Sequence, residues 1–243
     1  MSKYTPNTVL VAFFALATAV VGCMNNEKAP QPPETASQEC TSLFDGETLN
    51  GWAQLGNAAI FVEDGAIVGT GVQEPVNTFL RTNQEYTDFD LSLEFKIDSL
   101  FNSGIQFRSA VAVEEMIYDH QAGNGDRYQH VTEPGRVYGI QAEIDGTQRG
   151  WTAQVYEEQG RGWLETFSKE TMPLILDHSA WNRIRVRVIG DSISTWINGN
   201  LIAAMTDTEG RSSGFIALQI HSVRRSQGSN LSVRFRDIDI CTL

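Results

Sequence analysis

Hydrophobic and polar residues alternate one by one along many short segments of this chain, and a period of two predicts β-strands. The clearest cases are Asp90–Asp98 and Arg183–Val188, in which every second residue is apolar. Turn-forming residues separate such segments, and Glu63-Asp64-Gly65 and Asn198-Gly199 predict tight hairpins. No long segment has helical periodicity. The pattern therefore predicts an all-β, single-domain β-sandwich or jelly roll.

The segment with the least regular pattern is Val111–Arg136, which is polar and contains glycine. We predict a long loop there, and long loops in compact domains are often functional. Further strands are predicted at Ala59–Val62, Ala66–Val68, Ser194–Ile197, Leu201–Ala203, Phe215–Ile220 and Leu231–Ile240.

The most informative polar face belongs to Tyr138–Asp145. Its apolar positions are Ile140, Ala142 and Ile144, and its polar positions are Gln141, Glu143 and Asp145. In a strand, residues two apart on one face are separated by about 7 Å. Short acceptors in such a row can hold a polyol or a metal, or can move a proton. We predict that the apolar side faces the core and the polar side faces a ligand.

Three other segments place unusual polar residues at alternate positions. They contribute Gln106 and Arg108, Gln219 and His221, and Gln154 with Tyr156, the last followed by Glu157, Arg161 and Trp163. Each residue alone is ordinary, because strand Gln and Arg commonly face solvent and a lone Trp is more often core. Their co-occurrence on separate strands favours a polar groove on one concave sheet.

Glu143-x-Asp145-x-x-Gln148 nearly matches the Glu-x-Asp-x-x-Glu strand of concanavalin-like endoglucanases. Retaining hydrolysis there needs two carboxyl groups about 5 Å apart, one of them protonated. Gln148 stands at the position of the acid and cannot supply a proton. The ordinary retaining mechanism therefore lacks its acid unless Glu157 or Asp145 substitutes.

The N-terminal segment predicts secretion. Lys3 precedes an apolar run, Val9–Val20, that is too short to span a bilayer comfortably. The run ends at Val20-Val21-Gly22-Cys23, which resembles a bacterial lipobox, so we predict acylation at Cys23. An ordinary signal peptide with an incidental cysteine is the alternative.

The predicted organisation has three parts. These are a lipoprotein signal peptide at residues 1–22, a Pro-rich tether at 23–40 and a jelly-roll domain at 41–243. The expected location is the bacterial outer membrane or periplasm, with membrane contact through the lipid alone.

The composition allows a sizeable core and an acidic surface. The 243 residues are 41% hydrophobic and include 18 Lys and Arg against 30 Asp and Glu. Without residues 1–22, which hold Lys3 and no acid, the net charge is 17 minus 30, or −13. Such a field repels nucleic acid and suits a neutral or cationic ligand.

Two cysteines remain if Cys23 carries lipid. Cys40 and Cys241 lie at the two ends of the predicted domain. In an oxidising compartment we expect a disulfide that joins the first and last strands. Two unpaired thiols are the alternative.

Metal and cofactor motifs are weak or absent in the sequence. Asp119, His120, Asp126 and His130 fall within the predicted loop without a recognised ligand spacing. We assign them to a solvated loop and predict no metal site and no cofactor, with a divalent metal left open.

Several motifs together resemble the 3-keto-disaccharide hydrolase domain family over Thr41–Leu243. They are Leu43-Phe44-Asp45-Gly46, Leu49-Asn50-Gly51-Trp52, Phe89–Phe95, Asn102–Ile105, Tyr138–Asp145, Trp181-Asn182, Trp196–Gly199 and Phe235–Ile238. The resemblance implies a concanavalin/laminin-G-like jelly-roll β-sandwich on a bacterial lipoprotein. It also implies action on glycosides oxidised at carbon 3. The chain departs from the family pattern at Tyr156–Gly160 and in the inserted segment Val111–Arg136.

The chemistry that the resemblance implies suits the polar residues. A ketone at carbon 3 acidifies the hydrogen on carbon 2, so that a base can remove it and the substituent on carbon 1 can leave. Three roles are needed, with alternatives for each: His221 or Glu143 as base, Arg108 or Arg161 as enolate stabiliser, and Tyr156 or Glu157 as acid. Gln106, Gln141, Asp145, Trp163 and Gln219 are then substrate-binding residues. The expected partners are a carbohydrate substrate and an upstream sugar 3-oxidoreductase.

Two other functions fit the same fold. The first is a carbohydrate-binding module or lectin-like surface lipoprotein, in which Trp163 and Trp196 stack on sugar rings. The second, a concanavalin-like β-glucanase, ranks lowest because of Gln148.

Overall fold

The computed structural model describes residues 39–147, 149–164, 176–224 and 231–243. Its strands are β1 (Glu39–Ser42), β2 (Trp52–Leu55), β3 (Ala59–Glu63), β4 (Ala66–Thr70), β5 (Thr78–Tyr86), β6 (Phe89–Ile97), β7 (Asn102–Val111), β8 (Met116–Gln121), β9 (Arg127–Thr132), β10 (Val137–Asp145), β11 (Val155–Glu158), β12 (Gly162–Trp163), β13 (Asn182–Ile189), β14 (Ser192–Ile197), β15 (Asn200–Thr206), β16 (Gly214–Ile220) and β17 (Ser232–Thr242). The predicted signal peptide, Cys23 and nearly all of the tether lie outside these residues, as does Gln148.

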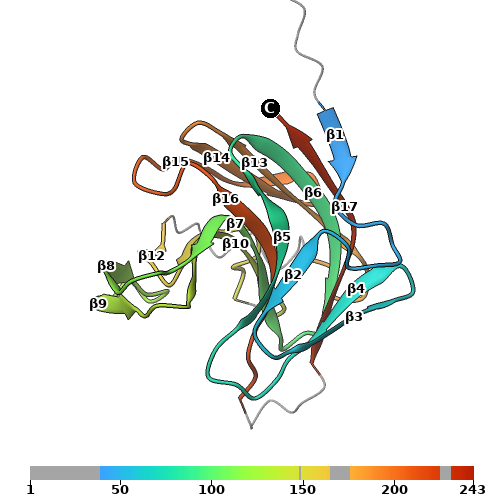
Figure 1. Cartoon of the computed structure of the whole chain (residues 1–243), viewed down its shortest axis with the longest axis horizontal. Helices are drawn as coiled ribbons and strands as arrows, with labels where there is room; N and C mark the ends of the chain where they lie inside the picture. Colours follow the sequence, from blue (N-terminus) through green and yellow to red (C-terminus); the bar gives the residue numbers. More distant parts are fainter. Residues whose placement is uncertain (1–38, 148, 165–175, 225–230) are drawn as a thin grey trace, which may run out of the picture. The chain divides into compact units, whose positions relative to one another are not determined.

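Within the described residues the strands form two sheets (Figure 1). The first sheet has the order β15-β14-β13-β6-β17-β4-β3, with β1 paired to β17. The second has the order β2-β5-β16-β7-β10-β11-β12-β8-β9. The predicted all-β sandwich is therefore confirmed. In the same residues, no helix has the length and apolar character needed to cross a membrane.

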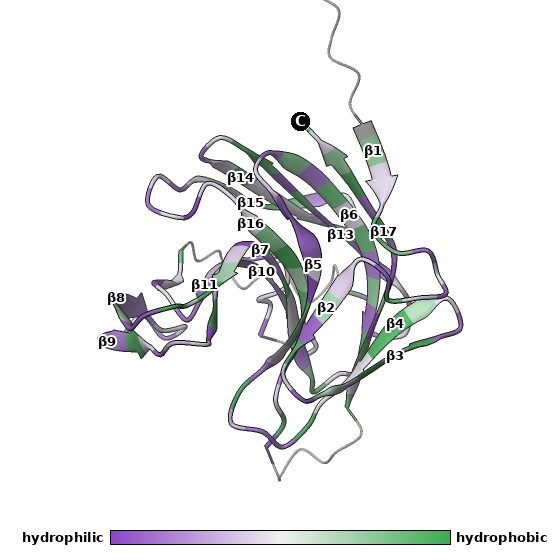
Figure 2. Cartoon of the chain, in the orientation of Figure 1, coloured by the Kyte–Doolittle hydropathy of each residue, from purple (hydrophilic) through white to green (hydrophobic). Residues whose placement is uncertain are grey.

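The apolar positions of the alternating strands form the core between the sheets. Phe95 of β6, Ile184 of β13 and Phe235 of β17 are fully buried, as are Phe107 of β7 and Ile140 of β10. Figure 2 shows that β4 and β16 are mainly hydrophobic. Burying this much apolar surface is the main source of stability for a sandwich without helices.

Both predicted tight hairpins are confirmed. The β3–β4 turn has positive φ at Asp64 (51°) and Gly65 (73°), and the β14–β15 turn has positive φ at Asn198 (49°) and Gly199 (82°). Two successive residues with positive φ are the signature of the type I′ turn, whose twist matches that of the paired strands.

The prediction of a loop at Val111–Arg136 was wrong. This segment contains the β8–β9 hairpin, and a parallel bridge from Gln121 to Gly162 joins it to β12. Its pattern is inverted, because the paired residues Ile117 and Val131 are exposed whereas His120 is buried. A pattern with apolar residues outside and polar residues inside does not read as an ordinary half-buried strand.

The expected disulfide between Cys40 and Cys241 is present. The two residues are direct partners in the β1–β17 register, so the bond joins the first and last described strands. It belongs to the first sheet, away from the polar face of β10.

Candidate active site

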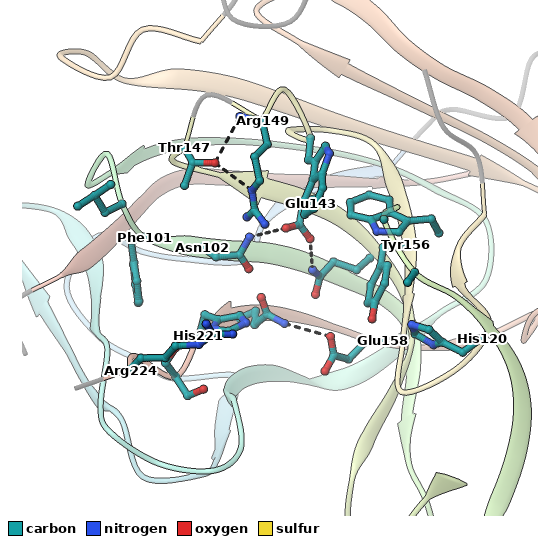
Figure 3. A pocket seen from close by; sticks show the side chains of 18 residues that line it. Phe101, Asn102, His120, Glu143, Thr147, Arg149, Tyr156, Glu158, His221 and Arg224 are labelled. Atoms are coloured by element: carbon teal, nitrogen blue, oxygen red, sulfur yellow. Dashed lines mark hydrogen bonds between the residues drawn. The ribbon is translucent and has the colours of Figure 1, made fainter. Parts of the chain in front are cut away.

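A cavity of about 920 Å³ lies on the face of the second sheet that points away from the core (Figure 3). Its lining comes from β7, β8, β10, β11, β12 and β16 and from the loops beside them. The residues are Leu100, Phe101, Asn102, His120, Ala122, Gly123, Gln141, Glu143, Thr147, Arg149, Trp151, Tyr156, Glu158, Trp163, Gln219, His221, Ser222 and Arg224. The polar groove expected from the sequence is therefore a pocket of the size that holds a small-molecule ligand.

Glu143 lies in the wall of this cavity because β10 alternates as predicted. Ile140, Ala142 and Ile144 face the core, which leaves Gln141 and Glu143 on the cavity side. The Glu143 carboxylate accepts hydrogen bonds from Asn102 Nδ2 and from Gln141 Nε2, the latter at 2.7 Å.

The environment of Glu143 suits a proton acceptor. The pKa of its carboxyl group is raised to about 7, mainly by burial and in smaller part by the Asp145 carboxylate. The amides of Asn102 and Gln141, and the Arg149 guanidinium, oppose this rise. Burial is the largest cause of the raised pKa, and repulsion from the Asp145 carboxylate is secondary. A pKa near neutrality is favourable for a general base.

His221 lines the same cavity as a neutral imidazole. Its Nδ1 lies 2.7 Å from the carbonyl oxygen of Ser222, which can only accept, so Nδ1 carries the proton. Burial lowers the pKa of the ring, which favours the neutral form. The other nitrogen, Nε2, then has a free lone pair, so His221 is a second possible base.

Aromatic rings form one side of the cavity. Tyr156 and Trp163 pack with their centroids 5.1 Å apart, Trp151 packs on Trp163 at 5.0 Å, and the Arg149 guanidinium lies 3.8 Å from the centre of the Trp151 ring. Burial strongly raises the pKa of Tyr156, so its hydroxyl stays protonated and can donate a hydrogen bond. Such a wall suits the apolar face of a sugar ring.

Glu158 and Gln219 form a hydrogen-bonded polar pair in the cavity wall. Gln219 Nε2 donates to Glu158 Oε2 at 3.3 Å, and burial raises the pKa of the Glu158 carboxyl group. Gln219 Oε1 is buried and has no hydrogen-bond partner among the described residues. A buried acceptor without a partner is costly, and a ligand hydroxyl could satisfy it.

Arg108, predicted to face the groove, does not line the cavity. Register shifts in the pairing of β7 with β10 and β16 mark a bulge near this residue, whose φ is 47°. The bulge turns the side chain aside, and its guanidinium donates to the Thr87 carbonyl at 2.9 Å and to Asp88 at 3.1 Å. The predicted role of Arg108 in enolate stabilisation is therefore withdrawn.

Glu157 and Arg161 also lie away from the cavity. Tyr156 faces it, so the next residue along β11, Glu157, points to the opposite face. There Arg161 Nε contacts Glu157 at 2.6 Å, and Arg161 Nη1 contacts Asp207 at 2.8 Å. These three residues line a separate hollow. The predicted roles of Glu157 as acid and of Arg161 as enolate stabiliser are both withdrawn.

Two other predicted binding residues lie just behind the cavity wall. Asp145 is fully buried and holds Arg149 Nε at 3.0 Å. Gln106 is fully buried and donates from Nε2 to Gln141 Oε1 at 2.7 Å. Neither lines the cavity, so each acts through a neighbour rather than on a ligand. Gln141, Glu143, Tyr156, Trp163, Gln219 and His221 are brought together as expected.

Sequence reasoning missed several lining residues, notably Asn102, His120, Arg149, Trp151 and Glu158. The signal for Glu158 was present, because it is two positions from Tyr156 on one strand. His120 had been assigned to solvated loop, but it is buried and its Nδ1 lies 2.7 Å from the Gly160 carbonyl oxygen. Within the described residues, no group of three or more His, Cys, Asp or Glu side chains is placed to hold a metal ion.

A buried carboxylate, a histidine and an aromatic wall on one face of a jelly roll are consistent with a carbohydrate-active protein, the class that the family match supports. Residues 39–241 match the 3-keto-alpha-glucoside-1,2-lyase-like domain, and the chain belongs to this family. The predicted resemblance is confirmed, and membership places the protein among glycoside-acting enzymes. A comparison with curated proteins found no match.

Solved structures similar to this chain share its jelly-roll fold. A candidate glycosyl hydrolase from Parabacteroides distasonis is 18% identical with a TM-score of 0.51, over 84% of this chain and 94% of that one. A β-glucanase from Bacillus licheniformis is 12% identical with a TM-score of 0.51, over 86% and 100%. A Bacillus subtilis protein with a galectin-like fold is 12% identical with a TM-score of 0.53, over 80% and 90%. At these identities the likeness shows the fold alone.

Proposed function

We propose that the protein cleaves 3-keto-glycosides by removing the proton on carbon 2 and eliminating the substituent on carbon 1. The observation that carries the proposal is Glu143, a buried carboxylate in the cavity wall with a pKa of about 7. The family match supports the same chemistry. An α-proton beside a ketone needs a base of this kind, because a base works best when its pKa is close to the operating pH.

The proposed reaction has three steps. Glu143 takes the proton from carbon 2, and the electron pair of that C–H bond forms an enolate with the carbon 3 ketone. The enolate re-forms the ketone, a double bond forms between carbons 1 and 2, and the bond from carbon 1 to the leaving oxygen breaks. Water then adds across the double bond, with its oxygen on carbon 1 and a proton on carbon 2, to complete net hydrolysis.

The cavity offers a residue for each remaining role. Arg149 lines it and replaces Arg108 and Arg161 as the cation proposed to stabilise a developing enolate. Glu158 replaces Glu157 as the acid for the leaving oxygen, because it lines the cavity and burial raises the pKa of its carboxyl group. Tyr156 donates a hydrogen bond, since its pKa is too high for a good acid. His221 is the alternative base.

Retaining hydrolysis of an unoxidised glycoside is less favoured. Asp145 is buried behind the cavity wall, where it pairs with Arg149, so it does not reach a bond held beside Glu143. Glu158 pairs with Gly139, four residues along β10 from Glu143, so the two side chains are not direct neighbours on the sheet face. Retaining enzymes need their two carboxyl groups about 5 Å apart.

Carbohydrate binding without turnover is the second candidate, and the Trp151–Trp163 wall favours it. Trp196, suggested by the sequence as another stacking residue, lies on β14 of the other sheet, with the Arg185 guanidinium 4.7 Å from its ring centre. It cannot contribute to this cavity.

The deciding experiment compares a 3-keto-disaccharide with the same sugar before oxidation. We expect turnover of the oxidised sugar alone, with exchange of the carbon 2 hydrogen in D₂O followed by NMR. Equal rates on the two sugars, or binding without product, would refute the proposed chemistry.

Location and partner are part of the proposal. We infer that the lipobox-like sequence directs acylation of Cys23 and attachment to the outer membrane or to the periplasmic face of a bacterial membrane. An upstream sugar 3-oxidoreductase would supply the ketone. Incorporation of labelled palmitate into the wild type, but not into Cys23→Ser, is the expected result.

A further inference from the structure

A chain of buried hydrogen bonds leads from β7 to Glu143. Ser109 Oγ donates to Gln106 Oε1 at 2.7 Å, Gln106 Nε2 donates to Gln141 Oε1 at 2.7 Å, and Gln141 Nε2 donates to Glu143 Oε2 at 2.7 Å. All four side chains are buried. Gln106 and Ser109 do not line the cavity, so they can influence a ligand only through Gln141 and Glu143.

The direction of this chain is fixed by its last member. An ionised carboxylate only accepts, so Gln141 must turn its NH₂ group towards Glu143. The Gln141 oxygen then faces Gln106 and requires a donor, which is the Gln106 NH₂ group. The Gln106 oxygen in turn requires the hydroxyl of Ser109. Each amide therefore points its positive end at Glu143, and bonds in such a series strengthen one another.

Two glycines leave the space that this chain occupies. A Cβ at Gly104 would lie 2.3 Å from Gln141 Cδ, and one at Gly139 would lie 2.4 Å from Ser109 Oγ. Gly104 is the partner of Glu143 across the β7–β10 ladder, and Gln106 is the partner of Gln141. Strand register and small residues thus hold both amides in one arrangement.

We propose that Gln106 is a positioning residue, which acts through Gln141 to hold the Glu143 carboxylate as an oriented acceptor. The role of Glu143 as base rests on the proposed function. The hydrogen-bonded series from Ser109 through Gln106 and Gln141 to Glu143, called the relay below, does not. Asn102, Asp145 and Arg149 also act on the Glu143 carboxyl group. The other titratable or charged groups that line the same cavity are His120, Tyr156, Glu158, His221 and Arg224. No hydrogen bond of the Gln106 side chain involves any of them.

The test uses Gln106→Met, which keeps the size of the side chain but removes its donor. Without that donor, Gln141 is free to turn and donates less strongly to Glu143. We expect the midpoint of Glu143 titration, followed by ¹³C NMR of labelled glutamate side chains, to rise by about half a unit. We also expect kcat to fall about tenfold with KM unchanged, because Gln106 does not touch the substrate.

Gln154→Met is the matched control. Gln154, which the sequence grouped with Tyr156, is buried and does not line the cavity. Its side-chain amide donates to the Gly150 carbonyl at 3.0 Å and takes no part in the relay. The Gln154→Met variant should lose stability as Gln106→Met does, while the midpoint of Glu143 titration stays as in the wild type. Ser109→Ala removes only the first donor, so we expect it to raise the midpoint of Glu143 titration by a smaller amount. It replaces Gln106→Met in the test if that variant does not fold.

The NMR measurement separates this inference from the proposed function. If Gln106→Met shifts the Glu143 titration but no variant acts on 3-keto-glycosides, the relay stands and the proposed reaction falls. If the wild type turns over 3-keto-glycosides while Gln106→Met and Gln154→Met have the same titration and the same kcat, the relay is refuted.

Discussion

Glu143 lies where ionisation is costly, because almost all of its side chain is removed from water and its nearest cation, Arg149, is already paired with Asp145. Two amide donors offset part of that cost but leave the pKa near 7. A purely structural residue at this position would be expected to be neutral. A carboxylate at this position is therefore better explained by chemistry than by stability.

Replacing Glu143 with Gln should remove turnover while keeping the fold. The variant has the same size but no proton acceptor, so turnover of a 3-keto-glycoside should fall roughly a hundredfold or more. Glu94→Gln, a change on the other sheet where Glu94 pairs with Arg183 and Arg236, should leave the rate unchanged. Wild-type turnover in Glu143→Gln would transfer the role of base to His221.

The same substitution should alter how stability depends on pH. The raised pKa of Glu143 means that, between about pH 4.5 and pH 7, the unfolded chain has released this proton while the folded chain still holds it. The stability that this group contributes is thus complete below pH 4.5 and is lost as pH rises through 7. Relative to the wild type, Glu143→Gln should gain up to about 3 kcal/mol between pH 4.5 and pH 8. Urea unfolding of both proteins at pH 4.5 and pH 8 measures this gain. If the difference in unfolding free energy between variant and wild type is the same at both pH values, burial does not raise the pKa of Glu143.

At the scale of elements, strand alternation located most of the site, and its failures have physical causes. On β11 the period of two should have grouped Glu158, not Glu157, with Tyr156, so this error was avoidable. Arg108 was not predictable in the same way. Its bulge arises from how β7 pairs with two neighbours, which no single strand reveals. The β8–β9 hairpin was missed because its buried side is polar, as at His120.

The turn between β11 and β12 is held by an ion-pair network, which gives the residues withdrawn from the site a structural role. Arg161 joins Glu157 on β11 to Asp207 after β15. This turn also carries Gly160, whose carbonyl oxygen accepts from His120, and it leads directly to Trp163. The network therefore supports the aromatic wall from behind.

Arg161→Met should be strongly destabilising, because it leaves two largely buried carboxylates without their cation. Removing one partner of a buried pair typically costs about 3–5 kcal/mol, and Arg161 is partly exposed, so we expect the lower end. Arg127→Met is the matched control, since its pair with Asp119 is exposed and should contribute less than about 1 kcal/mol. Equal urea midpoints for the two variants would show that the network does not stabilise the turn.

At the scale of the whole molecule, the sequence predicted the sandwich because its strands separate apolar from polar positions so regularly. Predicting the cavity was harder, since its lining comes from residues more than a hundred positions apart, such as Asn102 and His221. Alternation tells which side of a strand faces the groove, but not which strands are neighbours or which loops close the ends. Arg149 and Trp151 belong to a connection between strands, where no period exists to place them.

The disulfide offers the last test, because it closes the described domain into a covalent ring. Cys40 and Cys241 are 201 residues apart, and a loop of that length corresponds to about 5 kcal/mol in the chain-entropy treatment of crosslinks. We expect the double variant Cys40→Ser with Cys241→Ser to lose about 3–5 kcal/mol of unfolding free energy. The parent protein and the double variant both carry Cys23→Ser, so that no third thiol competes.

Reductant serves as the control for this measurement. It should lower the urea midpoint of the parent protein to that of the double variant and leave the double variant unchanged. The cavity belongs to the second sheet, whereas β1 and β17 belong to the first, so turnover per folded molecule should be the same in both proteins. A parent protein indifferent to reductant, with two titratable thiols after denaturation, would show that the bond does not form.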